Sequence, residues 1–71
     1  MTAMRQVLIY QDEDGGWCAE CPSLPGCFSE GNSREDAIRN VKEAIAAYVE
    51  SLEIDGLPIP PDNQSAVLIA V

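Results

Sequence analysis

The feature that most constrains this 71-residue chain is a helical hydrophobic period between Asn32 and Gly56. Apolar side chains recur there at steps of three and four residues, which lines one face of an α-helix. These positions are Ala37, Ile38, Val41, Ala44, Ile45, Tyr48, Val49 and Leu52. A helix of about 20 residues is roughly 30 Å long. We therefore expect one amphipathic helix to lie across a small sheet built from the rest of the chain.

Local signals predict where this helix begins and ends. Ser33 is a good N-cap, because its hydroxyl can accept a hydrogen bond from a backbone N–H two or three residues later. Glu35 and Asp36 place negative charge at the positive end of the helix dipole. Gly56 suits a left-handed C-cap, and the prolines that follow it exclude further helix.

Three segments before the helix are predicted to be strands. Met4–Gln11 is rich in β-branched and large apolar residues. The polar turn Asp12–Gly16 follows it, and its glycines supply the positive φ that a hairpin needs. Trp17–Cys21 is then the second strand. A tight turn at Ser23–Gly26 joins it to the third strand, Cys27–Glu30.

The second strand alternates in character, so two choices of its helix-facing side are open. One side carries Trp17, Ala19 and Cys21, and the other carries Cys18 and Glu20. We prefer the first set facing the helix, because the alternative would bury the carboxylate of Glu20.

Ala66–Val71 reads as a last strand after a proline-rich loop at Leu57–Gln64. The element order is then β-β-β-α-β, an α+β fold in which one helix covers a four-stranded sheet in two layers. A right-handed crossover places the last strand parallel to the third, and a position beside the first gives the spatial order 3-2-1-4.

An apolar edge strand without charge or proline invites pairing with another chain. We expect a second copy or a partner to cover Ala66, Val67, Leu68, Ile69, Ala70 and Val71; burial inside the monomer is the alternative.

Length and charge restrict the classes of function. Residues 1–71 make one domain with a marginal core, for which self-association is a common remedy. The formal charge is −8, from 4 Lys and Arg against 12 Asp and Glu, which disfavours direct nucleic-acid binding. An acidic surface serves solubility or captures a basic protein.

The sequence shows no signal peptide and no run of about 18 apolar residues, so we expect a cytoplasmic protein.

The cysteines Cys18, Cys21 and Cys27 are interpreted as reduced and partly buried. Cys18 and Cys21 have the spacing of half a zinc site, but a full site needs about four ligands and the chain has no histidine. Residues three apart on a strand also point to opposite faces. We expect neither a metal nor a cofactor.

Several short motifs in fixed order resemble the HicB antitoxin family, over about Val7 to Pro61. They are the run from Asp14 to Cys27 (DGGWCAECPSLPGC), then Glu30-Gly31-Asn32-Ser33, Glu35-Asp36-Ala37, Lys42-Glu43-Ala44-Ile45 and the proline-rich Leu57–Pro61. The family's pattern is roughly G-G-aromatic-x-A-x-x-P-x-L-P-G-C, then G-x-S/T-x-E-E/D-A, then x-E-A-I in a helix. Each motif is weak alone, and their order makes the resemblance fairly specific.

This resemblance implies a partial RNase H-like fold of β-β-β-α-β order. It also implies a function, since HicB proteins bind and neutralise HicA toxins, which are small basic ribonucleases that cleave messenger RNA. Family members commonly self-associate, and many carry a C-terminal DNA-binding domain. The sequence given ends at Val71 without such a domain, so we expect no operator binding by this chain alone.

The predicted mechanism is stoichiometric inhibition of the toxin, with opposite charges steering the encounter. The candidate toxin contacts are Asp12, Glu13, Asp14, Trp17, Glu20 and Glu30. The alternatives are that Trp17 belongs to the core and that each carboxylate is simply a solvated surface group.

Two other functions compete with this one. Asp12, Glu20 and Glu30 lie on or near three strands, where RNase H-like enzymes hold two divalent ions. A phosphodiesterase needs positive charge near its substrate, however, and neither a histidine nor a nucleophile–histidine pair is present. We therefore expect no enzymatic activity. The third reading is a homo-oligomeric domain without a toxin, joined through the last strand.

Overall fold

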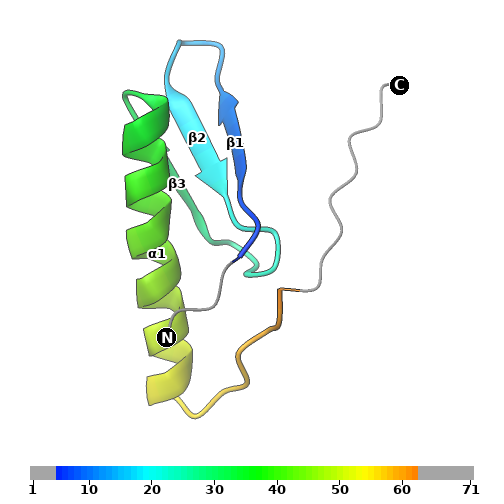
Figure 1. Ribbon diagram of the computed structural model, residues 1–71. Coiled ribbons are helices and arrows are strands. Elements are labelled where there is room, and N and C mark those ends of the chain that lie inside the picture. Colours follow the sequence, from blue (N-terminus) through cyan, green and yellow to red (C-terminus); the bar gives the residue numbers. More distant parts are fainter. Residues whose placement is uncertain (1–4, 63–71) are drawn as a thin grey trace, which may run out of the picture.

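The computed structural model describes residues 5–62, which form a three-stranded antiparallel sheet and one long helix (Figure 1). The strands are β1 (Leu8–Gln11), β2 (Trp17–Glu20) and β3 (Phe28–Gly31), in the spatial order β1-β2-β3. Helix α1 (Arg34–Ile54) follows β3 and packs against all three strands, most extensively against β3. The α+β architecture predicted for these four elements is confirmed. The expected fourth strand, Ala66–Val71, lies outside the described residues.

Helix α1 begins and ends where the sequence signals predict. Ser33 is the N-cap, with extended backbone angles, and its Oγ accepts a hydrogen bond of 3.1 Å from the backbone N–H of Asp36. Past the other end, Gly56 has φ +67°, the left-handed conformation that favours glycine. The Leu57 N–H then donates to the Leu52 carbonyl at 2.9 Å, which closes a Schellman motif. The helix has no basic residue in its last turn.

The core lies between β2 and α1 and is built from small side chains. Ala19 of β2 and Ala37 of α1 have no exposed surface, and Val41 is buried beside them. Trp17 packs on the margin of this cluster and is half-buried. The preferred inward side of the second strand is therefore confirmed, because Cys21 is also buried while Glu20 is exposed.

A second buried cluster lies under the loop between β2 and β3. It consists of Cys21, Leu24 and Cys27, with Tyr48 and Val49 of α1 packed against it. Two successive turns shape the loop: the Leu24 N–H donates to the Cys21 carbonyl at 3.1 Å, and the Cys27 N–H donates to the Leu24 carbonyl at 3.0 Å. Gly26 has φ +79°, which confirms the predicted left-handed glycine after Pro25.

The strand boundaries differ from the prediction by a few residues. The first strand was expected from Met4, but pairing begins at Leu8, whose partner is Glu20, the last residue of β2. Residues 5–7 have no β2 residue opposite them, because the chain turns away from Cys21 onward. The third strand begins at Phe28 instead of Cys27, since Cys27 is held in the turn. No helix within residues 5–62 is long and apolar enough to cross a membrane.

Gly31 allows the end of β3 to pass directly beneath the start of α1. A Cβ atom at this position would lie 2.5 Å from the backbone nitrogen of Ala37 and 2.8 Å from the Asp36 Cβ. Both neighbours belong to the first turn of the helix, which the Ser33 cap holds in place. The backbone approach at this point therefore requires glycine.

We predict that Gly31→Ala lowers the free energy of unfolding by about 1–3 kcal/mol or more, because the added methyl group must push α1 away from the sheet. Urea denaturation followed by circular dichroism measures this. Asn32→Ala, at the adjacent exposed position, is the control and should change stability by less than about 0.5 kcal/mol. Equal stability of the Gly31→Ala variant and the wild type would contradict the close approach.

Candidate partner-binding surface

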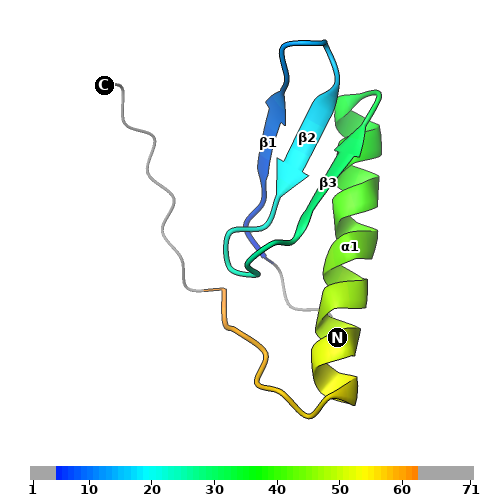
Figure 2. The same ribbon diagram turned by 180° about the vertical axis from the view of Figure 1, so that it is seen from behind.

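The sheet face opposite α1 carries two cross-strand rows of side chains. One row is Leu8, Glu20 and Phe28, and the other is Tyr10, Cys18 and Glu30. These six residues are called the open face below. Among the described elements, α1 alone packs on the sheet, and it covers the other side (Figures 1 and 2). Each row therefore presents apolar and carboxylate groups together.

The apolar members of the open face are unusually exposed for their size. Leu8 is 38% exposed, Tyr10 50% and Phe28 65%. None of the three was among the predicted contact residues. The alternation of each strand indicates which of its side chains point away from the helix. The register then shows that Leu8, Tyr10 and Phe28 share this face of the sheet.

The acidic hairpin between β1 and β2 is held by one of its own carboxylates. Oδ1 of Asp12 accepts hydrogen bonds from the backbone N–H groups of Asp14 and Gly16, both at 2.9 Å. The Asp12 N–H in turn donates to the Gly16 carbonyl at 2.8 Å, and Gly15 has φ +87°. Asp12 thus has a structural role, while Glu13 and Asp14 are exposed in the turn.

A polar hollow of about 430 Å³ lies beside this hairpin, between β3 and the start of α1. Asp12, Trp17 and Glu30, three of the six predicted contacts, line it together with helix residues. Two helix side chains in its wall have partners of their own: the Arg39 guanidinium pairs with the Asp36 carboxylate, and Asn40 Nδ2 donates to the Glu30 carbonyl at 2.7 Å.

The structure divides the predicted contact residues among three places. Glu20 and Glu30 lie on the open face, and Asp12, Glu13 and Asp14 lie in the hairpin. Trp17 belongs to the helix-facing side, where it packs against the core, which agrees with the alternative considered for it. Trp17 and Glu20 consequently cannot contribute to one flat surface.

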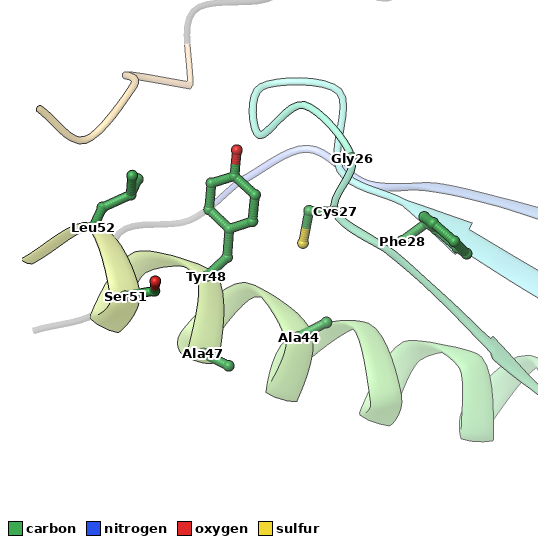
Figure 3. Close-up of a pocket in the computed structure, with 8 residues that line it drawn as sticks. All are labelled: Gly26, Cys27, Phe28, Ala44, Ala47, Tyr48, Ser51 and Leu52. Carbon is green, nitrogen blue, oxygen red and sulfur yellow. The ribbon is translucent and has the colours of Figure 1, made fainter. Parts of the chain in front are cut away.

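An apolar groove of about 370 Å³ runs between the loop before β3 and the C-terminal half of α1 (Figure 3). Phe28 lies at one end and Leu52 at the other, with the thiol of Cys27 pointing towards the helix between them (Figure 3). The Tyr48 hydroxyl donates to the Pro25 carbonyl at 3.0 Å and so ties the loop to α1. The remaining lining residues are Gly26, Ala44, Ala47 and Ser51.

Two groups of the open face, Tyr10 and Cys18, have raised pKa values. Burial raises the pKa of the Cys18 thiol, and the nearby carboxylates of Asp12 and Glu30 raise it further. The Tyr10 pKa is raised in turn, first by the charge of a Cys18 thiolate and then by burial and Glu20. Both groups are therefore neutral at neutral pH.

The other two cysteines are buried free thiols. Burial raises the pKa of Cys27, the proximity of Cys21 adds to the rise, and the charge of Arg5 opposes it. The Arg5 guanidinium donates to the Ser23 hydroxyl at 3.0 Å, and that hydroxyl lies 3.6 Å from the Cys21 sulfur. These thiols are packed into the core beneath the loop.

The three carboxylates considered for a two-metal site are not brought together. Asp12 and Glu30 line the polar hollow, while Glu20 lies in the other cross-strand row. In the part of the chain that the structure describes, no three His, Cys, Asp or Glu side chains lie close enough to hold a metal ion. The described structure therefore does not gather these carboxylates in one cleft.

Comparison with known proteins gives a family match over nearly the whole chain. The family model described as HicB_like antitoxin of bacterial toxin-antitoxin system matches residues 6–70. A UPF0150 protein of Thermoplasma acidophilum is 44% identical over 63 residues, which cover 89% of this chain and 91% of the relative. UPF0150 proteins of Synechocystis and Helicobacter pylori are 46% and 39% identical, covering 80% and 83% of this chain and 72% and 82% of those relatives. No solved structure gives a significant match.

We predict that Glu30→Gln accelerates alkylation of Cys18 by iodoacetamide at about pH 8, roughly two- to threefold, because removing a nearby negative charge favours the reactive thiolate. Mass spectrometry of the Cys18 peptide over time measures the rate. Glu43→Gln, an equal change of charge at an exposed position of α1, should leave the rate unchanged. The same rate in both variants would show that Glu30 does not act on this thiol.

Proposed function

The chain belongs to the HicB-like antitoxin family, and from this premise we propose that it neutralises a small basic HicA-type messenger-RNA ribonuclease by direct protein–protein contact. The match of the family model to residues 6–70 is the observation that carries this proposal. The family is one of antitoxins, so a toxin partner is implied. The site of action would be the cytoplasm, where messenger RNA is translated.

The physical basis of neutralisation is charge and surface, with no chemical step on the antitoxin. A net charge of −8 attracts a basic toxin over several ångströms and accelerates productive encounter. Once bound, the antitoxin has only to exclude RNA from the toxin's active site. A domain with a small core and a large exposed sheet is sufficient for that task.

We propose that the carboxylates of Glu20 and Glu30 and those of the adjacent hairpin contact the toxin. The hairpin joins the strands that carry the open face, so one partner surface can reach Glu13, Asp14 and the row that contains Glu30. Asp12 would act mainly by holding the turn, given its two hydrogen bonds to backbone N–H groups. Trp17 would contribute through the part of its side chain that lines the polar hollow.

We further propose that Ala66–Val71 forms a strand beside β1, completes a partial RNase H-like sheet, and pairs there with a second copy. Within the described residues β1 pairs with β2 alone, so one edge of the sheet is available at β1. The Gln6 N–H donates to Oδ2 of Asp62 at 2.9 Å, which brings the chain after α1 back to the start of that edge. From Asp62 the remaining residues are long enough to follow β1 in parallel.

We predict that an inactive HicA-type toxin binds the chain in a 1:1 ratio of subunits and that the association rate falls at least about tenfold between about 50 mM and about 500 mM salt. Stopped-flow fluorescence gives the rate, and an RNA cleavage assay with active toxin shows whether binding inhibits it. Absence of binding at low salt would contradict the proposed function. An association rate that does not depend on salt would contradict electrostatic steering of the encounter.

Light scattering on the purified chain is predicted to show a dimer or a larger assembly. Ile69→Lys should shift it to monomer, because a charge cannot be buried in an apolar strand interface without a large cost. Ile54→Lys, at a 76% exposed position of α1, is the matched control and should leave the assembly intact. A monomeric wild type would refute pairing through the last strand.

A further inference from the structure

We propose that the open face is the docking surface for a basic segment of the partner, and that it selects arginine side chains flanked by apolar ones. This inference rests on the proposed function and adds to it the face that binds and the chemistry that it recognises. It places Leu8, Tyr10 and Phe28, rather than Trp17, at the centre of the interface.

The first support is the apolar content of this face. Leu8 and Phe28 stand on either side of Glu20 in one cross-strand row, and Tyr10 stands beside Cys18 in the next. Large side chains that are 38–65% exposed and gathered on one face mark an interaction surface more often than scattered ones do. Aromatic side chains are also the usual anchors of protein interfaces.

The second support is charge, which identifies the kind of occupant. Glu20 and Glu30 are exposed carboxylates within the two rows, and the neutral Cys18 lies between Tyr10 and Glu30 in the second row. Two copies packed face to face would bring four carboxylates together, in chains that each carry a charge of −8. Like charges at an interface are costly. The face therefore suits a basic partner and disfavours a second copy of this chain.

The spacing of the two carboxylates suits a helix of the partner. Glu30 lies opposite Cys18, and Cys18 is two residues from Glu20 on β2, so the two glutamates are diagonal neighbours. Diagonal positions of an antiparallel pair are about 7–8 Å apart. Residues three or four apart on a helix are about 5–6 Å apart. Two long basic side chains one helical turn apart can thus reach both carboxylates at once.

Arginine fits the surroundings of Glu20 better than lysine does. A guanidinium can pair with a carboxylate through two parallel hydrogen bonds and can stack on an aromatic ring at the same time. Phe28 supplies such a ring directly across the strand from Glu20, and Leu8 supplies apolar surface for the methylene stem on the other side. A lysine ammonium can also lie over the ring, but it forms no bidentate pair with the carboxylate and cannot stack flat on the ring at the same time.

The exposed side of α1 offers no comparable surface around Glu43 and Glu50. Glu43 and Glu50 are exposed there, but the exposed large apolar side chain of the helix, Ile54, lies at its C-terminal end. The helix therefore provides carboxylates of the same kind outside an apolar row. Substitutions at these positions change net charge without touching the open face.

The test uses a short amphipathic helical peptide with two arginines one turn apart and leucines beside them, and an identical peptide with lysines. Each is titrated into the ¹⁵N-labelled full chain and followed by NMR. The expected result is amide shifts concentrated at the six open-face residues, with the arginine peptide binding at least about fivefold more tightly. Shifts centred on α1 or on the hairpin tip, or equal binding of both peptides, would overturn the proposal.

Variants separate local contact from net charge. The double variant Glu20→Gln/Glu30→Gln should weaken binding of the arginine peptide at least about tenfold, while Glu43→Gln/Glu50→Gln, with the same net charge, should weaken it less than about twofold. Phe28→Ala should weaken binding, and Ile54→Ala should not. All six positions are exposed, so circular dichroism should show unchanged folding. Equal effects of the two double variants would overturn the proposal.

An inactive HicA-type toxin, titrated against the same variants, distinguishes the two levels of the proposal. Loss of affinity in the open-face double variant alone supports both the function and the face. Tight binding that is equal in both double variants retains the proposed function and overturns the docking face. If the toxin does not bind the wild type while the arginine peptide binds the open face, the function fails and the recognition chemistry stands.

Discussion

The packing of Ala19 against Ala37 and Val41 is the contact on which the rest of the structure depends. Ala19 and Ala37 are completely buried, and side chains this small let the helix backbone approach the central strand closely. Gly31 continues this close approach at the end of β3, where even a methyl group would collide with the first turn of α1. A single helix packed closely against the sheet covers one of its sides. The other side of the sheet therefore takes no part in the core that the described residues form.

Because α1 packs on one side of the sheet only, the apolar strand residues on the other side are left uncovered by any described element. A two-layer domain of this size cannot bury both sides of its sheet, so Leu8, Tyr10 and Phe28 are exposed although each is large enough to be a core residue. The loop between β2 and β3 adds a second set of buried residues. Its Leu24, Cys21 and Cys27 pack against Tyr48 of α1, and the Tyr48 hydroxyl donates a hydrogen bond to the Pro25 carbonyl of the loop.

The distribution of charge is the second property of the proposed docking face. The hairpin carboxylates and those of Glu20 and Glu30 lie on and next to the open face. The Arg39 guanidinium, which lines the polar hollow beside the hairpin, pairs with Asp36, and the Arg5 guanidinium donates to the Ser23 hydroxyl. Membership of the HicB-like antitoxin family gives this arrangement its context. In the proposed complex with a basic protein, attraction and burial would be provided by the same face.

Local residue chemistry determined the elements that could be predicted from sequence: the helix with its Ser33 cap and Gly56 terminus, the turn at Pro25–Gly26, and the inward set of Trp17, Ala19 and Cys21. Each follows from neighbouring residues, through backbone preference or periodicity. The strand ends and the composition of the surface depended on tertiary structure, because they are set by register. Only the pairing of Leu8 with Glu20 and of Glu20 with Phe28 places these distant residues in one row, and no local pattern encodes which residues of different strands stand opposite one another.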